Sequence, residues 1–459
     1  MTPRVLVLGE ALLDVDVAGR ASRLSPDAPV AVVDDPVERP RPGGAALAAA
    51  LAASDGADVV LATPLGDDAD ADTLRSVVPS GVEVIALPAE GGTPVKRRVL
   101  AAGQVLVRLD TGGTSGTWET PPADLDAAVR DVDAVLVADY GRGLTSIPAF
   151  QHLVTRLAER VPVVWDPHPR GAAPAAGTWL FLPNQSELSA LDGTDVHAVG
   201  EVGDAARRVR ERLAPRALAV TLGDRGALLV QGDAPPAVFG VEPVNGHDTC
   251  GAGDRFAAAA TVRLARGDVM SEAVEHAVRS AASFVAAGGA AAYGEVGTSA
   301  AATGSGNDAT DGLDVLARVR AAGGVVVATG GCFDLLHAGH VATLEAARRL
   351  GDCLVVLLNS DASVRGLKGP GRPLVPARDR ARVLASLACV DAVVVFDEDR
   401  PDAALRDLRP HLWVKGGDYA GGPLPEQQVL DSWGGRSVVL PYLSGRSTTR
   451  LVAAANGHA

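Results

Sequence analysis

Short apolar runs alternate with alanine-rich stretches along the first half of the chain. The apolar runs have the length and the valine and leucine content of buried strands, and they read VLVLG, VVLAT, VEVIAL, AVLVADY, VPVVWD, LFLPN and ALAVTLG. The alanine-rich stretches, the first of which follows Gly43 and Gly44, are typical of helices. This alternation predicts a mainly parallel sheet with helices on both faces.

Two segments of the first half do not follow this alternation. The segment between the first strand and Gly43 is polar and spaced by prolines, VAGRASRLSPDAPVAVVDDPVERPRPGG. The other, PVKRRVLAAGQVLVRLD, alternates with the period of a strand. We expect these two segments to form a small β-sheet that acts as a lid over a substrate site.

The second half carries a new series of strands behind a linker. The segment TSAAATGSGNDATDG has no periodicity and predicts a flexible linker over residues 298–312, between domains at 1–297 and 313–459. A short helix, LDVLARVRAAG, then leads into the apolar runs GVVVATG, DCLVVLLNSD, DAVVVFDED, PHLWVKGGD and RSVVLPYLSG. These runs predict a compact five-stranded sheet of Rossmann type.

Composition narrows the classes of partner. At 459 residues the chain exceeds what one core usually holds, which agrees with two domains. Its net charge is −14, only 3% of its residues are aromatic, and it has no basic run, so we expect neither nucleic acid nor a membrane as partner. The longest apolar stretch, 281–293, is too short and too interrupted by glycine to span a bilayer.

The cysteines favour a reducing compartment. Cys250, Cys332, Cys353 and Cys389 stand far apart without a CxxC pair, so neither a zinc site nor a disulfide framework is indicated. We therefore expect a cytoplasmic protein that acts on small molecules.

The motif DTCGAGD has the features of an anion pocket at a helix start. Gly251, Ala252 and Gly253 leave the backbone bare enough for amide N–H groups to converge on one anion, and the helix adds its positive end. Asp254 would lie beside this pocket, where it could deprotonate a hydroxyl that attacks a nucleotide's terminal phosphoryl group. A glycine-rich turn with an aspartate is also a common way to begin any helix, so the motif by itself leaves both readings open.

The motif GCFDLLHAGH marks a second phosphate site. His337 and His340 are three residues apart, directly after a predicted strand and the turn at Gly330 and Gly331. Two imidazoles at this spacing can donate hydrogen bonds to phosphate, and the small Ala338 and Gly339 between them leave room for a nucleotide. A metal-binding pair or two helix-capping histidines are the alternatives.

Lysine is rare in this chain. Of its 42 basic residues only Lys96, Lys368 and Lys415 are lysine, and they lie in TPVKRR, RGLKGPGRP and WVKGGDY. A flexible point charge on a phosphate is one task in which arginine does not replace lysine. We therefore expect these three lysines to contact phosphate, although a chance placement of any one of them stays open.

Several longer stretches add to these motifs and support a family resemblance. They are SRLSPDAPVAVV, VADYGRG, PNQSE, LNSDASVRGLKGPGRP, VKGGDY and the late STT. With them the first domain resembles the ribokinase-like sugar kinases, and the second resembles the cytidylyltransferase-like nucleotidyltransferases with their HxGH motif. The fusion in this order is similar to the bifunctional heptose 7-phosphate kinases and heptose 1-phosphate adenylyltransferases, and the likeness covers nearly the whole chain outside the linker.

The resemblance implies ATP-dependent phosphorylation of D-glycero-D-manno-heptose 7-phosphate at O1 by the first domain. Asp254 would be the base and Gly251 to Gly253 the anion hole. Sugar contacts would come from Asp14, Gly43, Gly44 and Asp139, and nucleotide or phosphate contacts from Asn184, Glu187, Thr221 and Gly223. Local structural roles stay open for some of them: Asp14 could cap a loop, and Asn184 with Glu187 could form a helix capping box.

The resemblance also implies the cofactor and the assembly of the kinase. Magnesium that bridges the β- and γ-phosphates of ATP is expected on charge grounds. The sequence shows no cluster of protein ligands for this ion, and Glu187 is the side chain that could contribute to it. A homodimer is expected by analogy with ribokinase-like enzymes, which often pair through the lid.

For the second domain the resemblance implies transfer of an adenylyl group from ATP to heptose 1-phosphate, which gives ADP-heptose and pyrophosphate. His337, His340 and Lys415 would stabilise the developing charge. Further nucleotide and phosphate contacts would come from Gly331, Cys332, Phe333, Lys368, Ser447, Thr448 and Thr449.

The first domain departs from the ribokinase-like pattern at three positions. Leu47 stands where asparagine is common, Arg255 where a small threonine is usual, and His168 where lysine is common. In the second domain Gly330 replaces a frequent asparagine. Two further readings follow: another sugar kinase fused to a cytidylyltransferase, or a degenerate sugar-binding first domain with only the second domain catalytic.

Overall fold

The computed structural model describes most of the chain, in two compact units. The described residues are 2–25, 27, 30–101, 104–113, 115–116, 118–241, 249–293, 312–417 and 424–440. One unit comprises residues 1–193, 209–221 and 243–297, and the other comprises 194–208, 222–242 and 298–459. The expected linker lies outside the described residues except for its last residue, Gly312, and the boundary expected at residue 297 stays a prediction.

The first unit contains the predicted parallel sheet. Its strands follow the order β13-β12-β11-β10-β1-β4-β5, and every neighbouring pair is parallel. Their bounds are β1 Arg4–Gly9, β4 Asp58–Pro64, β5 Val82–Leu87, β10 Ala134–Ala138, β11 Val163–Asp166, β12 Leu180–Phe181 and β13 Ala217–Thr221. The central strand β1 is fully buried from Val5 to Leu8, as its continuous apolar run predicts.

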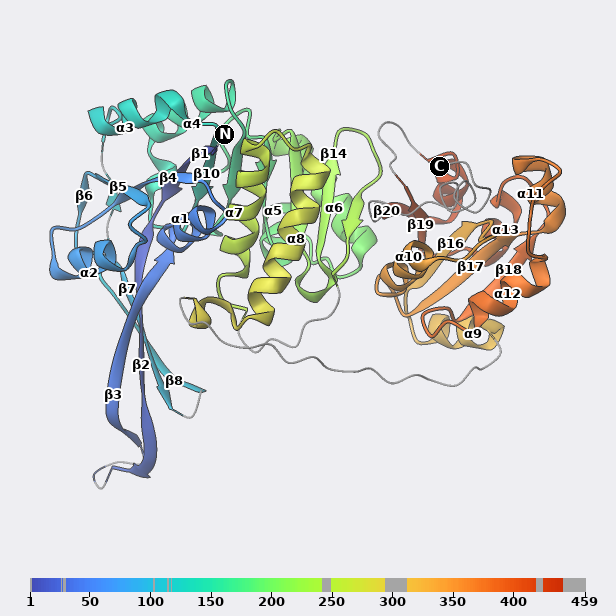
Figure 1. Cartoon of the computed structure of the whole chain (residues 1–459), viewed down its shortest axis with the longest axis horizontal. Helices are drawn as coiled ribbons and strands as arrows, with labels where there is room; N and C mark the ends of the chain where they lie inside the picture. The colour runs from blue at the N-terminus through green and yellow to red at the C-terminus, as the bar shows by residue number, and fades with distance from the viewer. Residues whose placement is uncertain are drawn as a thin grey trace, which may run out of the picture. The chain divides into compact units, whose positions relative to one another are not determined.

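Helices cover this sheet. α1 and α7 pack directly on it, α1 against β1 and β4 and α7 against β10 and β11, and α7 and α8 lie side by side (Figure 1). The helices of the first unit are α1 Ala45–Ser54, α2 Ala69–Val77, α3 Ala123–Ala128, α4 Pro148–Ala158, α5 Gln185–Asp192, α7 Ala252–Ala265 and α8 Met270–Ala286. The residues of α6 (Val199–Leu213) are divided between the two units, and the antiparallel hairpin of β14 (Ala227–Gln231) and β15 (Ala237–Phe239) belongs to the second.

The predicted small sheet is present as a four-stranded ribbon. Figure 1 shows it projecting from the rest of the first unit. It has the order β3-β2-β7-β8, with β2 Ala11–Leu24, β3 Ala31–Gly44, β7 Val95–Ala101 and β8 Gln104–Thr111. Two very short strands, β6 Ala89–Glu90 and β9 Ser115–Gly116, pair separately. We call the four-stranded ribbon the lid sheet.

The second unit contains the predicted five-stranded parallel sheet. Its order β18-β17-β16-β19-β20 is the arrangement of a nucleotide-binding half, with the first strand in sequence at the centre. The strands are β16 Val326–Gly331, β17 Cys353–Asn359, β18 Ala392–Phe396, β19 Leu412–Gly416 and β20 Arg436–Leu440. Because β17 and β19 flank β16 on opposite sides, the strand order reverses there, and ligands bind such sheets at the carboxyl ends beside this point.

The helices of the second unit include the short one predicted before the sheet. They are α9 Gly312–Ala321, α10 Ala338–Arg348, α11 Asp361–Lys368, α12 Ala377–Ala385, α13 Asp402–Leu408 and α14 Gln427–Leu430. The apolar faces of α9, α13 and α14 join the strands in one core around the fully buried Trp413 and Leu357.

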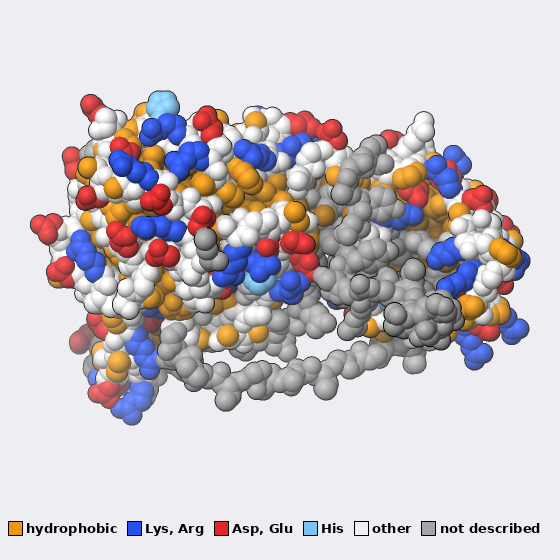
Figure 2. All heavy atoms as spheres, turned by 45° about the horizontal axis from the view of Figure 1, so that its top comes forward, with side chains coloured by type: hydrophobic (Ala, Val, Ile, Leu, Met, Phe, Trp, Pro, Cys, Tyr) orange, Lys and Arg blue, Asp and Glu red, His pale blue; other side chains and the backbone are white. Residues whose placement is uncertain are grey.

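The surface is mixed in charge. Acidic and basic side chains are interspersed with apolar ones on the face shown in Figure 2. Over the described part of the chain, no helix is both long and apolar enough to cross a membrane.

Candidate active sites

The GAGD motif begins α7, as the sequence predicts. Gly251 caps the helix with φ 79°, in the left-handed region that favours glycine. A Cβ there would also lie 2.9 Å from Leu47 Cδ2, so both backbone and packing require glycine. A Cβ at Gly253 would meet nothing within 4 Å, which leaves open space beside Ala252 and the first turn of the helix. The Ala252 N–H donates to Thr249 O at 3.1 Å, so the motif presents the N–H groups of its two glycines at the helix N-terminus, an arrangement that binds anions.

Asp254 lies in this first turn with 9% of its surface exposed. Burial raises the pKa of its carboxyl group to about 7; a hydrogen bond from Tyr140 opposes the rise, Asp14 adds to it and Lys96 opposes it. The Tyr140 hydroxyl donates this hydrogen bond to Asp254 Oδ1. A carboxylate with a pKa near neutrality is well matched to accept a proton from a sugar hydroxyl.

The loop after β10 fixes Tyr140. The buried Glu10 carboxylate accepts hydrogen bonds from the backbone N–H of Tyr140 at 2.9 Å and of Leu144 at 3.1 Å. The Asp139 carboxylate accepts from Gly141 N at 2.7 Å and from Thr145 Oγ1 at 2.8 Å. Asp139, expected to bind sugar, thus uses both oxygens to shape the loop that carries Tyr140.

Asp166, at the end of β11, adds a half-buried carboxylate that the sequence did not reveal as a site residue. Burial raises its pKa well above the ordinary value, and the nearby carboxylates of Asp254, Glu187 and Asp139 raise it further. Its position at the end of a strand, in VVWDP, could have identified Asp166 as a site residue from the sequence. Carboxylates that oppose one another's ionisation attract a cation, and this suits a magnesium–nucleotide complex.

Asn184 and Glu187 form a helix capping box, the local structural role that the sequence left open for them. Asn184 Oδ1 accepts from Glu187 N, and Glu187 Oε2 accepts from Asn184 N, both at 2.9 Å. Burial raises the pKa of Glu187 as well. Within the described ranges, no group of three or more His, Cys, Asp or Glu residues could hold a metal ion by itself. Magnesium would therefore need phosphate oxygens in addition to Glu187 or Asp166.

Thr221 lies beside this capping box. Thr221 ends β13 and forms an isolated parallel bridge with Asn184, and Gly223 opens the following turn with φ 64°. The carboxyl ends of β11, β12 and β13 thus bring Asp166, Asn184 and Thr221 to one edge of the sheet.

The expected sugar contacts are brought together at the root of the lid sheet. Asp14 is buried, and its Oδ2 accepts a hydrogen bond from Arg41 at 2.9 Å. Its Oδ1 has no hydrogen-bond partner among the described residues, so one acceptor remains for a ligand hydroxyl. A Cβ at Gly43 would fall 2.8 Å from the Asp14 carboxyl carbon, and Gly44 caps α1 with φ 58°. Gly43 is therefore needed for the close approach of the Asp14 carboxyl group, and Gly44 for the positive φ at the start of α1.

The departures from the kinase pattern do not obstruct the anion pocket. Leu47 is buried and packs against Gly251. Arg255 donates to Leu51 O at 3.1 Å and forms an ion pair with Asp55, so it points toward the end of α1 and away from the pocket. His168 Nδ1 accepts from the backbone N–H of Arg170 within its own loop.

In the second unit, His337 caps α10 and His340 lies one turn inside it. His337 Nδ1 accepts from Gly339 N at 3.2 Å, and the two imidazole rings stack with centroids 3.9 Å apart. Burial lowers the pKa of His340 to about 4, and His337 and then Lys368 lower it further, against a backbone hydrogen bond at Leu335. His340 is therefore neutral at pH 7 and offers a phosphate an N–H donor without a full charge.

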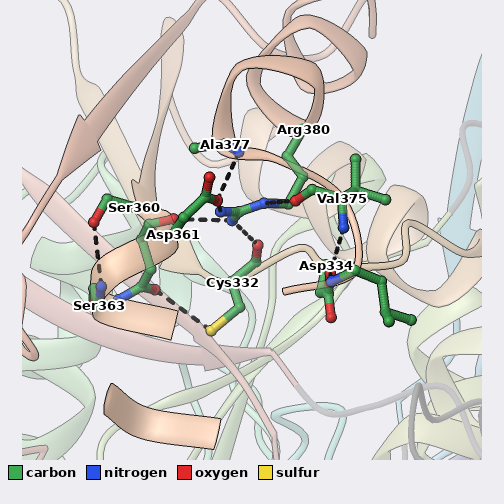
Figure 3. A network of polar contacts seen from close by, with 10 residues as sticks. Cys332, Asp334, Ser360, Asp361, Ser363, Val375, Ala377 and Arg380 are labelled. Atoms are coloured by element: carbon green, nitrogen blue, oxygen red, sulfur yellow. Dashed lines mark hydrogen bonds and ion pairs between the residues drawn. The ribbon is translucent and has the colours of Figure 1, made fainter. Parts of the chain in front are cut away.

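The loop before these histidines is held by a network that the sequence did not reveal (Figure 3). The buried Arg380 donates to the carbonyl oxygens of Cys332 at 2.5 Å and Asn359 at 2.9 Å, and it pairs with Asp361 at 2.7 Å. These contacts tie the loop after β16 to the loop after β17. Phe333 in this loop has φ 44°, a conformation that such a network can maintain.

Asp334 ties the same loop to the segment after Lys368. Its Oδ1 accepts from Leu374 N at 2.6 Å, and its Oδ2 pairs with Arg372 at 2.5 Å. Burial alone would raise its pKa, but the hydrogen bonds from Arg372, Val375 and Leu374 hold it below the ordinary value.

The two lysines of this unit come from a helix and a strand. Lys368 ends α11 and contributes to the low pKa of His340. Lys415 extends from β19, beside Thr329 and Gly330 of β16, and its Nζ lies 3.0 Å from Oε1 of the buried Glu426. Gly330 and Gly331 were expected in a turn after the strand, but the structure has them as the last two residues of β16, and Cys332 follows directly. Ser447, Thr448 and Thr449 lie outside the described residues.

Family models match both units. Residues 2–295 match the pfkB family of carbohydrate kinases, and residues 328–439 match the cytidylyltransferase-like family. Among solved structures, Arabidopsis thaliana ribokinase aligns with a TM-score of 0.50 at 22% identity, over 62% of this chain and 93% of that one. Escherichia coli phosphofructokinase-2 aligns with a TM-score of 0.50 at 20% identity, over 63% and 96%. These likenesses show the fold.

Relatives of the whole chain settle the family. The bifunctional protein HldE of Streptomyces coelicolor is 52% identical, over 99% of this chain and 96% of its own length. HldE of Syntrophotalea carbinolica is 35% identical, over 98% and 95%. The chain is therefore an enzyme of the bifunctional HldE family, in which a pfkB-type carbohydrate kinase is joined to a cytidylyltransferase-like nucleotidyltransferase.

Proposed function

We propose that this protein makes ADP-heptose in two separate steps. The first unit transfers a phosphoryl group from ATP to O1 of D-glycero-D-manno-heptose 7-phosphate, and the second transfers an adenylyl group from ATP to heptose 1-phosphate. The observation that carries the kinase step is Asp254, a buried carboxylate with a pKa of about 7 beside the bare backbone of Gly251 to Gly253.

In the kinase step Asp254 accepts the proton of the sugar O1 hydroxyl, and the O1 oxygen attacks the γ-phosphorus of ATP. A bond from O1 to phosphorus forms, the bond to the β-phosphate oxygen breaks, and ADP leaves. The N–H groups of Gly251 and Gly253 and the N-terminus of α7 stabilise the charge on the transferring group. Tyr140 orients Asp254, and magnesium, near Glu187 and Asp166, would neutralise the nucleotide phosphates.

In the adenylyl step an oxygen of the sugar 1-phosphate attacks the α-phosphorus of ATP and pyrophosphate leaves. No covalent bond to the enzyme is needed. His337 and the neutral His340 donate hydrogen bonds, and Lys368 and Lys415 supply the positive charge that the pentacoordinate phosphorus requires. We also include Ser447, Thr448 and Thr449 among the phosphate contacts, on the resemblance alone.

We further propose a homodimer that pairs through the lid sheet, in the cytoplasm where ATP is available. Support for the dimer comes from apolar side chains of this sheet that are about half exposed: Val105 54%, Val107 46%, Leu109 50% and Val37 57%. Exposed apolar strands at a sheet edge are normally covered. Light scattering on the purified protein distinguishes a dimer from a monomer.

The test of function is a two-tube assay. Purified protein is incubated with ATP, magnesium and D-glycero-D-manno-heptose 7-phosphate, with and without a phosphatase that removes the 7-phosphate of the 1,7-bisphosphate only, and sugar products are identified by mass spectrometry. We expect the 1,7-bisphosphate without phosphatase and ADP-heptose with it. ADP-heptose from supplied heptose 1-phosphate with no bisphosphate would refute the kinase step, and a requirement for CTP would refute the adenylyl step.

A further inference from the structure

Lys415 lies where the nucleotide site of the second unit is expected. It is the last residue but one of β19, and parallel sheets of this type bind ligands at the carboxyl ends of their strands. A lysine side chain is long and flexible, so a strand by itself does not fix where its ammonium group lies. The contacts of that group therefore decide whether it can meet a phosphate in one defined place.

Two contacts hold the Lys415 ammonium group. Its Nζ lies 3.0 Å from Oε1 of Glu426 and 5.5 Å from the centroid of the Trp413 ring. Trp413 precedes Lys415 by two residues on β19, so both side chains point to the same face of the strand. A cation within about 6 Å of an indole ring is attracted to the face of the ring. The ammonium group is thus held from two sides, and 23% of the side chain stays exposed.

The Trp413 ring has a fixed place in the core of the second unit. It is fully buried among the apolar residues of that core. A Cβ at Gly330 would fall 2.7 Å from Trp413 Cη2, so the ring needs glycine at this position. The departure at Gly330, where asparagine is frequent, therefore has a packing reason. It makes room for the ring that supports Lys415.

Glu426 is buried with an incomplete set of partners. Only 4% of its surface is exposed, and among the described residues its Oε2 has no hydrogen-bond partner. It directly precedes α14, whose Gln427 Oε1 accepts a hydrogen bond from Ser437 Oγ of β20 at 2.5 Å. This bond anchors the start of α14 to the sheet, and with it the carboxylate beside Lys415.

Stability alone does not account for this buried ion pair. Removing a carboxylate and an ammonium group from water costs more free energy than their attraction returns, unless every polar atom of the pair finds a partner. Within the part of the chain that the structure describes, Glu426 Oε2 finds none. An apolar pair of similar volume is often at least as stable. A buried carboxylate that faces the lysine of a phosphate site points instead to control of that lysine.

We propose that Glu426 is a positioning residue of adenylyl transfer, which holds the Lys415 ammonium group at the place where the α-phosphorus of ATP reacts. Glu426 itself does not touch the substrate. The proposal rests on the proposed adenylyl transfer and deepens it, because it names the residue that fixes one of the charges at the phosphorus. An ammonium group has three N–H donors, so Lys415 keeps donors for phosphate oxygens while it is bound to Glu426.

The first test is Glu426→Gln, with adenylyl transfer from ATP to heptose 1-phosphate as the assay. The variant keeps the size of the side chain and removes its charge. We expect kcat to fall about tenfold, because Lys415 then reaches the reacting phosphorus in only a fraction of its conformations. KM for ATP should stay within about twofold or fall, because the lysine keeps its charge and a negative charge that repels phosphate is gone. An unchanged kcat, or a rise in KM for ATP at constant kcat, overturns the proposal.

A double-mutant cycle shows whether Glu426 acts through Lys415. We expect Lys415→Met to lower kcat by about a hundredfold. Glu426→Gln, when added to Lys415→Met, should change kcat by less than about twofold. Additive losses overturn the proposal, because Glu426 would then act on the substrate or on another residue.

Thermal melting of the same proteins gives a second readout. Lys415→Met leaves the buried carboxylate of Glu426 without its cation, so it should lower the Tm of the second unit. The double variant also removes the negative charge and should regain most of that loss. A double variant that melts no higher than Lys415→Met overturns the pairing on which the proposal rests. The kinase activity of the first unit is the internal reference for each preparation.

Asp391→Asn is the matched control. Asp391 also forms an ion pair within the second unit, 2.9 Å from Arg348. It directly precedes β18, so it stands at the amino ends of the parallel strands, at the opposite edge of the sheet from Lys415. Asparagine keeps an oxygen that can accept the hydrogen bond from Leu354 N. We expect kcat and KM of adenylyl transfer to change by less than about twofold.

The outcomes separate the role of Glu426 from the substrate assignment. If the wild type uses another sugar 1-phosphate, or CTP, the proposed function fails in that respect, and the cycle with the accepted substrate decides about Glu426. If no substrate reacts, calorimetry of ATP binding decides. We then expect Lys415→Met to raise Kd about tenfold and the double variant to match it. An unchanged Kd for Lys415→Met, or additive rises in the double variant, overturns the proposal.

Discussion

The hydrogen bond from Tyr140 to Asp254 makes a sharp prediction for the pH dependence of the kinase. Burial raises the pKa of Asp254 to about 7, and the Tyr140 hydroxyl holds it below the value that burial alone would give. Tyr140→Phe removes the hydroxyl and keeps the ring. The pKa of Asp254 should therefore rise, and the base should be active only at higher pH.

The size of the effect follows from the type of bond. A hydrogen bond to a charged group contributes about 1.5–3 kcal/mol, which corresponds to about one to two pH units. With the pKa at about 7 in the wild type, about half of Asp254 is ionised at pH 7. A rise by one or two pH units lowers that fraction, and kcat at pH 7, by about five- to fiftyfold. Activity should recover at high pH.

The assay is kcat against pH at saturating ATP and sugar phosphate, for the wild type and two variants. Tyr293→Phe is the matched control, because Tyr293 is also partly buried but has no hydrogen bond to Asp254 in the structure. We expect the acidic limb of the profile to move to higher pH for Tyr140→Phe and to stay in place for Tyr293→Phe. A uniform loss of kcat with an unmoved limb would refute the reasoning, because Tyr140 would then act on binding and not on the base.

The remaining predictions concern both units. Asp254→Asn should abolish phosphorylation and spare adenylyl transfer. Because the pKa of Asp254 is higher in the folded than in the unfolded protein, its ionisation lowers the stability of the wild type as pH rises through about 7. Melting curves should therefore show that Asp254→Asn raises Tm more at pH 8 than at pH 5. His340→Ala should lower kcat of adenylyl transfer by about a hundredfold and leave the kinase activity intact. The wild type should keep its adenylyl transfer unchanged down to about pH 5, because His340 is neutral there. A loss of this activity around pH 6.5 would contradict the prediction. Arg380→Met should cost the second unit about 3–5 kcal/mol in urea unfolding, whereas Arg382→Met on the same helix should be near neutral; equal losses would sink the role given to the network. Chelation of magnesium with EDTA should stop both reactions and added Mg²⁺ should restore them, in contrast to a metal-independent rate.

Much of the fold follows from local pattern. The strands of both sheets coincide with the apolar runs, because a parallel strand covered on both faces must be apolar throughout. The lid sheet was predicted from proline spacing and from alternation in residues 94–110. The starts of the helices at Gly251 and His337 were predictable from the local preference of glycine and of polar residues for helix N-termini. This preference does not depend on distant parts of the chain.

The candidate sites were predictable only in part, for a physical reason. Asp254, His337 and His340 belong to contiguous motifs, so their chemistry is visible in the sequence itself. Tyr140 contacts Asp254 across 114 residues of sequence, and Arg380 reaches Cys332 across 48. Such contacts depend on which strands become neighbours and in which register, and local sequence carries no such information.

The sequence by itself determined the kinds of elements, the two phosphate-binding motifs and the scarcity of lysine. Only the tertiary structure decided how the charges interact: it brought the buried Asp254 close to Asp166, turned Arg255 away from the anion pocket, and placed Lys96 in a row with Asp14 and Asp110. The physical reason is that a pKa or a charged subsite depends on burial and on distances of a few ångströms between segments far apart in the chain. Those distances exist only once the sheets have formed.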